Sequence, residues 1–195
     1  MHRHIAFALA CVVVALAAGC ASSPSHFYTL SANATPGATH SKLAIAVGPV
    51  TVPASVDQPQ IVLSTSANQV SFDEFNRWAS PVQDNLARVV AENLVAILGT
   101  PRVTIYPQTL SSDVDYRVQI EVRNFESTLG KQAALDAVWS VRRMKGGKTD
   151  TGRTSVRESV PDASYDALAA AHSRAVARMS QEIAEMVLAL ERAAP

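Results

Sequence analysis

The fold of this chain is decided by residues 116–123, whose sequence is YRVQIEVR. The apolar side chains of Tyr116, Val118, Ile120 and Val122 alternate there with charged or polar ones. An alternation with a period of two places the two sets of side chains on opposite faces of a β-strand. The stretch therefore predicts a strand with one buried face and one face in water.

Two further strands are predicted downstream of this stretch. Residues 133–143 and 151–160 both contain β-branched or aromatic side chains, and the turn sequence KGGK at 145–148 joins them. Strands that follow one another so closely usually pair as antiparallel neighbours. We therefore expect residues 116–160 to form an antiparallel meander.

Shorter strands are predicted upstream. The sequence HFYTL at 26–30 reads as a first strand, and apolar alternation over 43–52 reads as a second that ends at Pro53. Residues 60–65 and 69–72 flank the turn sequence SAN and indicate a hairpin. A last short strand is expected at 103–106.

A helix is predicted to begin at Ser80 and Pro81. Ser80 can cap the helix, Pro81 suits the first helical position, and Gln83 would complete a capping box. Apolar residues then follow at helical spacing up to Ile97, and Gly99 is the expected stop.

A second, longer helix is predicted from Ser164 to Arg192. Its apolar stripe consists of Tyr165, Leu168, His172, Val176, Met179, Ile183, Met186 and Leu190. About 29 residues would span about 43 Å, more than twice the length of a typical strand. One interpretation is that the stripe packs on the sheet. The other is that the end bearing Met179, Ile183, Met186 and Leu190 overhangs it, as an interface for a partner or a second copy.

The fold class predicted from these elements is α+β: a largely antiparallel β-sheet with two main α-helices packed on it. Residues 1–19 precede it and read as a lipoprotein signal peptide. Their apolar run is about 14 residues long, too short to cross a bilayer and of the right length for a signal peptide. The sequence LAAGC then ends at Cys20, which we expect to be lipidated. An ordinary secretory signal followed by a chance cysteine is the alternative.

We therefore expect residues 20–25 to be the lipidated cysteine and its tether, and residues 26–195 to be one domain. Lys and Arg number 17, as do Asp and Glu, so the formal net charge is zero and gives no sign of nucleic-acid binding. The cysteines are Cys11 and Cys20, both near the N-terminus, which argues against a disulfide framework and a cysteine-based zinc site.

No catalytic motif is found in the sequence. The stretch GGKT at 146–149 lacks the earlier glycine of a P-loop, and neither a Gly-x-Ser-x-Gly nor a His-Glu-x-x-His motif is present. His26, His40 and His172 lie far apart, and His172 reads as a histidine at the edge of the core. We expect no catalytic residue, no metal site and no cofactor.

Two stretches carry a family resemblance: VDQPQIV at 56–62 and FDEFNRWASP at 72–81, preceded by FYTL at 27–30. They resemble the ABC-type transport auxiliary lipoproteins, the PqiC-like family. The residues that carry the resemblance are Phe27, Tyr28, Leu30, Pro59, Gln60, Ile61, Arg77, Trp78 and Pro81. We refer to these nine residues as the family motif.

The resemblance implies a non-catalytic, lipid-anchored envelope subunit of an MCE/ABC-type intermembrane transport system. Its partners would be an MCE-domain protein and inner-membrane transport components, with a homo-oligomer as a further possibility. Ala21 and Ser22 follow the cysteine where a retention signal would carry Asp, which favours the outer membrane by the family's sorting rules.

Other functions remain open at this point. The alternative function is a periplasmic lipoprotein that binds a lipid or another hydrophobic ligand alone, on the concave face of its sheet. A hydrolase is a third class, disfavoured by the missing catalytic residues. Within the family motif, Arg77 and Trp78 could be exposed contact residues, but the residues favour Trp78 packing at the helix entrance and Arg77 pairing locally.

Overall fold

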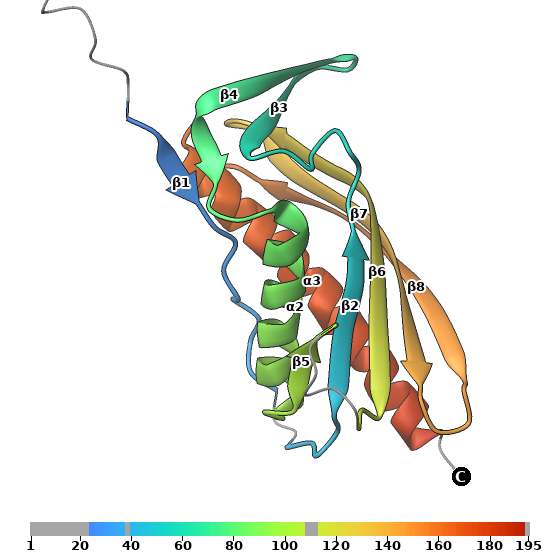
Figure 1. Ribbon diagram of the computed structural model, residues 1–195. Helices are drawn as coiled ribbons and strands as arrows, with labels where there is room; N and C mark the ends of the chain where they lie inside the picture. Colours follow the sequence, from blue (N-terminus) through green and yellow to red (C-terminus); the bar gives the residue numbers. More distant parts are fainter. Residues whose placement is uncertain (1–23, 38–39, 108–112, 194–195) are drawn as a thin grey trace, which may run out of the picture.

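The computed structural model describes residues 24–37, 40–107 and 113–193. The predicted signal peptide and Cys20 lie outside these residues. In chain order the elements are β1 (His26–Tyr28), β2 (Ile45–Thr51), β3 (Gln60–Ser66), β4 (Gln69–Trp78), α2 (Val82–Leu98), β5 (Val103–Ile105), β6 (Tyr116–Thr128), β7 (Gln132–Arg143), β8 (Thr149–Ser159) and α3 (Tyr165–Arg192) (Figure 1). The α+β class is therefore confirmed.

The larger of two sheets has five strands in the order β5-β2-β6-β7-β8. β6, β7 and β8 pair antiparallel along nearly their whole length, as the meander prediction required. β2 runs parallel to both β5 and β6. The two helices pack against each other, α2 over β2 and β5 and α3 over β7 and β8, so both cover the same face of this sheet (Figure 1).

The smaller sheet has three strands in the order β1-β4-β3. β3 and β4 form the predicted hairpin, and β1 pairs parallel with the last three residues of β4. The sequence led us to expect one sheet rather than two. The hairpin does not join the large sheet beside β6, because β6 already pairs with β2 and β7.

The helix boundaries differ from the prediction at one end. Pro81 is the N-cap of α2 and no side chain caps this helix, so the predicted cap by Ser80 is wrong. Gly99 ends α2 in the left-handed region with φ 60°, as expected, since glycine adopts this conformation without strain. Ser164 caps α3 by accepting a hydrogen bond from the backbone N–H of Ala167.

The overhang predicted for the second helix is not found. Met179 and Ile183 are fully buried, Leu190 is almost so, and Met186 is partly buried. The physical reason is strand length: β6 has 13 residues, which at the usual rise span about 43 Å. The 28 residues of α3 span about 42 Å, so sheet and helix match in length. The interpretation that the stripe packs on the sheet is therefore correct.

Close packing between α3 and the sheet depends on one glycine. A Cβ at Gly152 would lie 2.3 Å from Cη2 of Trp139, so the indole occupies the space that a side chain would need. The Nε1–H of Trp139 donates to Thr154 Oγ1 at 3.0 Å, and the hydroxyl of Thr154 donates to Glu182 on α3. In the part of the chain described, neither helix combines the length and apolarity needed to cross a membrane.

Candidate functional site

The small sheet brings the family motif together. In β4, Arg77 lies opposite both Phe27 on β1 and Gln60 on β3, and Trp78 lies opposite Tyr28. The end of β4 is therefore held on both sides. The backbone N–H of Trp78 donates to the carbonyl of Pro59 at 2.8 Å, and the next N–H in the chain, at position 79, donates to the carbonyl of Tyr28. Residues distant in sequence thus form one structural unit.

Trp78 fastens this unit to the rest of the molecule. It is buried, with 6% of its surface exposed, as the local-packing interpretation predicted. Its ring meets the rings of Phe125 on β6 and His172 on α3 edge to face, with centroids 6.2 Å and 6.3 Å away. Leu30 and Ile61 of the family motif are buried as well and belong to the same hydrophobic core.

His172 is a core residue rather than one at the edge of the core. Its ring stacks on Phe125 at 3.9 Å, and its Nε2 lies 2.8 Å from Ser127 Oγ. Burial lowers the pKa of His172 to about 3, because the charged imidazolium cannot be solvated there. The ring is therefore neutral at neutral pH.

A hydrogen-bonded cluster around Asp73 joins the small sheet to the start of α3. Tyr165 donates its hydroxyl to Asp73, and the carboxylate also accepts from the backbone N–H groups of Phe75 and Asn76 at 2.9 Å and 2.8 Å. Burial alone would raise the pKa of Asp73, but these hydrogen bonds lower it below its ordinary value. Tyr28 donates to Asn76 at 3.0 Å and completes the cluster.

The opposite side of the small sheet is open to solvent. Arg77 pairs locally, as expected. Its Nε donates to the backbone carbonyl of Glu74, and its Nη2 lies 3.7 Å from the side-chain carboxylate of the same residue. Phe27, Phe72 and Phe75 are 64%, 49% and 45% exposed. The outward direction of Phe72 and Phe75 was not predicted from the sequence. The available signal was that the alternation of Val70 and Phe72 with polar residues breaks after Phe72, since Phe75 follows three positions later.

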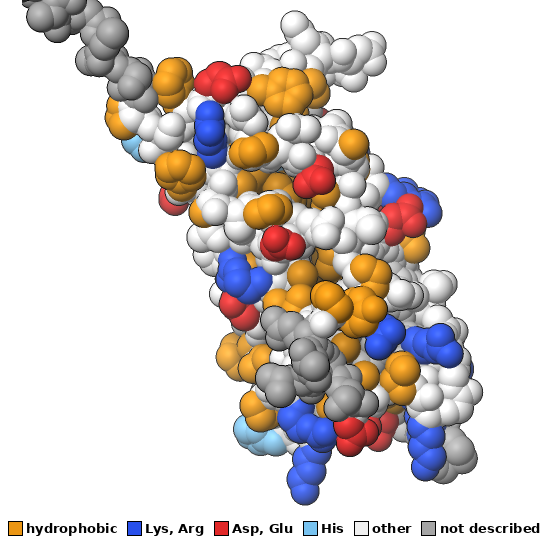
Figure 2. Space-filling model, viewed as in Figure 1, with side chains coloured by type: hydrophobic (Ala, Val, Ile, Leu, Met, Phe, Trp, Pro, Cys, Tyr) orange, Lys and Arg blue, Asp and Glu red, His pale blue; other side chains and the backbone are white. Residues whose placement is uncertain are grey.

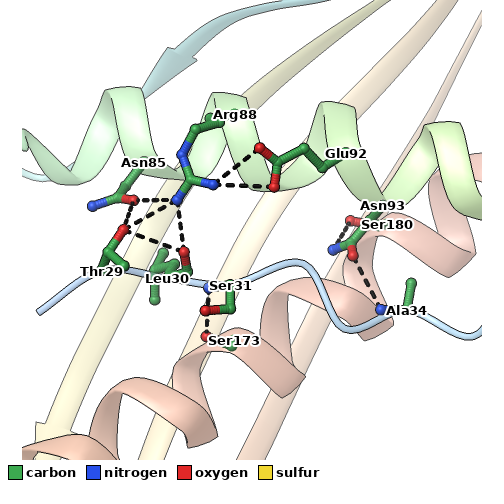
Figure 3. Close-up of polar contacts among 10 residues, drawn as sticks. All are labelled: Thr29, Leu30, Ser31, Ala34, Asn85, Arg88, Glu92, Asn93, Ser173 and Ser180. Carbon is green, nitrogen blue, oxygen red and sulfur yellow. Dashed lines mark hydrogen bonds and ion pairs between the residues drawn. The ribbon is translucent and has the colours of Figure 1, made fainter. Parts of the chain in front are cut away.

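A strap formed by residues 29–37 continues from β1 across the two helices (Figure 3). Arg88 on α2 donates through Nη2 to the carbonyl of Leu30 at 2.6 Å and to Thr29 Oγ1 at 3.1 Å. Its Nη1 contacts Glu92, which holds the guanidinium in place. The helix side chain therefore clamps the chain just after β1.

Two further polar contacts hold the strap to both helices (Figure 3). The backbone N–H of Ser31 donates to Ser173 Oγ on α3 at 3.0 Å, and that of Ala34 donates to Asn93 Oδ1 on α2 at 3.1 Å. Asn93 also donates to Ser180, so the strap, α2 and α3 are joined through one side chain. The strap is thus hydrogen-bonded to both helices.

A surface pocket of about 310 Å³ opens beside Trp78. It is lined mainly by apolar atoms from residues 57–59, before β3, and 78–81, before α2. Pro59 and Pro81 of the family motif are exposed on its rim. We refer to it as the motif pocket. In the described residues, no His, Cys, Asp and Glu side chains gather in a group able to hold a metal ion.

The comparisons with known proteins agree on the fold. A crystal structure described only as that of an uncharacterized protein matches with a TM-score of 0.69 at 21% identity, covering 85% of this chain and 99% of the other. Protein XCC0632 from Xanthomonas campestris, described as belonging to the family DUF330, matches with a TM-score of 0.66 at 19% identity, covering 86% and 97%. A search of curated proteins finds no match.

The family model described as "ABC-type transport auxiliary lipoprotein component" matches residues 28–184. The chain therefore belongs to this family, and the resemblance identified from its sequence is confirmed. The matched range contains β2 to β8, α2 and most of α3.

Proposed function

We propose that this chain is a non-catalytic, lipid-anchored subunit of an MCE/ABC-type intermembrane transport system, and that it docks the periplasmic assembly at the outer membrane. The observation that carries the proposal is the family match over residues 28–184. Membership in a family of transport auxiliary lipoproteins supports an accessory role beside a transporter. The proposal goes beyond family membership in three respects: the partner is an MCE-domain protein, the membrane is the outer membrane, and the chain has no catalytic activity.

The attachment of the N-terminal segment supports a lipid anchor. Cys20 stands six positions before His26, where β1 begins, and the strap that follows is clamped by Arg88, Asn93 and Ser173. An acyl chain contributes about 0.8 kcal/mol for each methylene group buried in the bilayer, so several chains give stable anchoring. A clamp at this place would transmit that anchoring to the whole domain.

The motif pocket is the surface that we assign to the transport partner. It is apolar, lies beside Trp78 and is bounded by exposed prolines, so a partner segment can enter it without displacing core residues. The apolar stripe of α3 does not serve this purpose, because Met179, Ile183 and Leu190 are buried within the chain itself. An association between copies would therefore need a different surface.

The anchor is tested with Cys20→Ser in the native host. We expect the wild-type protein in the outer-membrane fraction after a salt wash, and the Cys20→Ser protein outside that fraction. Recovery of both proteins in the outer-membrane fraction would contradict the lipid anchor. Recovery of the wild-type protein with the inner membrane would contradict the proposed location.

The partner is tested by site-specific photo-crosslinking in intact cells. A photoreactive residue at Gln58, on the motif pocket, should crosslink to a protein whose sequence contains an MCE domain. The matched control is the same residue at Arg153, an exposed position on the far strand β8. Equal crosslinking from both positions, or crosslinking from Gln58 only to proteins unrelated to transport, would contradict the proposal.

A further inference from the structure

The phenylalanines of this protein are distributed in an unusual way. The chain has five, of which Phe7 lies in the predicted signal peptide. Of the four in the described residues, Phe125 is buried, whereas Phe27, Phe72 and Phe75 are between 45% and 64% exposed. All three exposed ones lie on the small sheet. Phenylalanine is usually buried, so three exposed copies on one small sheet indicate a contact surface.

Strand register places the three side chains on the same side of the small sheet. Tyr28 and Trp78 face inward, so their neighbours Phe27 and Arg77, which are paired with each other, face outward. Asp73 faces inward to Tyr165, so Phe72, the residue before it, faces outward as well. We call Phe27, Phe72 and Phe75 the phenylalanine face.

The outward position of Phe75 depends on a bulge in β4. Ile61 pairs with Asp73 and the adjacent Gln60 pairs with Arg77, so residues 74–76 of β4 have no counterpart on β3. The Asp73 carboxylate holds this bulge through the N–H groups of Phe75 and Asn76. Bulges of this kind redirect a side chain, and here the bulge directs an aromatic ring into solvent.

The position of the N-terminal segment identifies what covers this face. Phe27 stands seven positions after Cys20, and an extended chain of that length spans at most about 25 Å. Figure 2 shows hydrophobic side chains on the surface around the start of β1 and over β4, at the end of the molecule from which the chain leads to Cys20. A bilayer that holds Cys20 therefore lies within reach of the phenylalanine face.

The chemistry of the face suits a lipid surface. Rings of this kind bury well at the boundary between headgroups and acyl chains. The charged neighbours Arg77 and Glu74 pair with each other, so entering the headgroup region does not leave an isolated charge behind. An acidic or basic protein partner would find little complementary charge here.

We propose that the phenylalanine face rests on the bilayer in which Cys20 is anchored, with the three rings inserted at the headgroup boundary. The inference rests on the proposed function, because it requires the lipid anchor. It also orients the molecule: the small sheet lies on the membrane, and the turn between β7 and β8 points away from it (Figure 1).

The inference is tested by lipid quenching of site-specific labels on the acylated protein. Acylation leaves the wild-type mature chain with no free thiol, so Phe27→Cys, Phe72→Cys and Phe75→Cys can each carry one environment-sensitive fluorophore. Met144→Cys is the matched control, since Met144 is 41% exposed and follows β7 at the opposite end. The purified lipoproteins are reconstituted into phosphatidylethanolamine–phosphatidylglycerol vesicles, with and without brominated acyl chains.

We expect brominated lipid to quench the labels at positions 27, 72 and 75 several-fold more than the label at 144. Equal and weak quenching at all four positions, with the protein still bound to the vesicles, would overturn this inference and leave the anchor intact. Labels that become shielded from both lipid and aqueous iodide as protein density rises would overturn it in favour of a second copy. Failure of the wild-type lipoprotein to incorporate would instead refute the anchor, and this inference with it.

Discussion

The two sheets of this protein use their aromatic side chains in opposite ways. In the five-stranded sheet, Tyr116, Phe125 and Trp139 are all buried beneath the helices. In the three-stranded sheet, Trp78 faces the core while the phenylalanine face is open to solvent. The helices cover one face of the large sheet along its whole length, whereas the small sheet is fixed mainly through Trp78 and the cluster around Asp73.

The buried aromatic side chains therefore stabilise the fold, whereas the exposed ones are available for contact with other molecules. A side chain that is buried by helices contributes to the free energy of unfolding, and a side chain that is exposed contributes little to it. We therefore expect substitutions in the large sheet, and at Trp78, to change stability. Substitutions on the phenylalanine face should instead change what the protein binds.

The largest effect is expected for Trp78→Ala. Removing the indole leaves a cavity between the small sheet, Phe125 and His172, and should lower the free energy of unfolding by about 3–5 kcal/mol. Urea unfolding followed by circular dichroism measures this value. The matched control is Phe72→Ala in the same strand, for which we expect less than about 1 kcal/mol. Equal losses for the two variants would remove the distinction between the inner and outer sides of β4.

The next effect belongs to the large sheet. In Gly152→Ala the new Cβ would lie 2.3 Å from the Trp139 ring, so the ring must shift, at a cost of about 1–3 kcal/mol. Ser155→Ala, at an exposed position of the same strand, should change stability by less than about 0.5 kcal/mol. Thermal and urea unfolding measure both. A fully stable Gly152→Ala protein would show that Trp139 is not closely packed against β8.

The pH dependence of stability should reveal the burial of His172. Its pKa is about 3 in the folded protein and about 6.5 when unfolded, so protonation below pH 6.5 favours the unfolded chain. Stability is therefore complete above pH 6.5 and falls as the pH drops towards 3. From pH 7 to pH 5 the loss should be about 2 kcal/mol. Whatever the absolute stability of the His172→Gln protein, its free energy of unfolding should fall by about 2 kcal/mol less than that of the wild type between pH 7 and pH 5. A His172→Gln protein with the same pH dependence of stability as the wild type would contradict this role of His172.

The smallest change is expected at the strap. Arg88→Gln removes the donor to Leu30 and Thr29 from a half-exposed site, which should cost about 1 kcal/mol and speed amide hydrogen exchange at Ser31 and Ala34. Arg123→Gln, which breaks only the exposed pair with Glu121, should have nearly no effect on either quantity. Unchanged exchange at the strap in Arg88→Gln would mean that the guanidinium does not hold it.

Much of the fold could be predicted because strong local patterns coincide with the packing. The alternation from Tyr116 to Val122 specifies β6, and Ser164 and Gly99 mark helix ends by their side-chain chemistry. The overhang of α3 could not be judged correctly, because strands of typical length were assumed while β6 has 13 residues. The sequence also could not show that Ser80 does not cap α2, because a suitable residue type does not ensure that its hydroxyl reaches the backbone N–H groups of the first turn.

The site was predicted only in part, for a physical reason. The family motif named residues of β1, β3 and β4, but their meeting depends on a parallel pairing between β1 and β4 that no local pattern signals. The bulge that turns Phe75 outward depends on the Asp73 carboxylate, which accepts hydrogen bonds from the backbone N–H groups of Phe75 and Asn76. The strap was read as a plain loop, because the groups that hold it, on Arg88, Asn93 and Ser173, come from distant helices.

The central claim, that the phenylalanine face serves contact rather than stability, is tested most directly by one variant with Phe27→Ser, Phe72→Ser and Phe75→Ser. We would measure its unfolding in urea and its ability to restore envelope integrity in cells that lack the wild-type protein. The account predicts a free energy of unfolding within about 1 kcal/mol of the wild-type value, together with lost or strongly reduced restoration. A stable variant that restores the envelope as well as the wild-type protein does would contradict it.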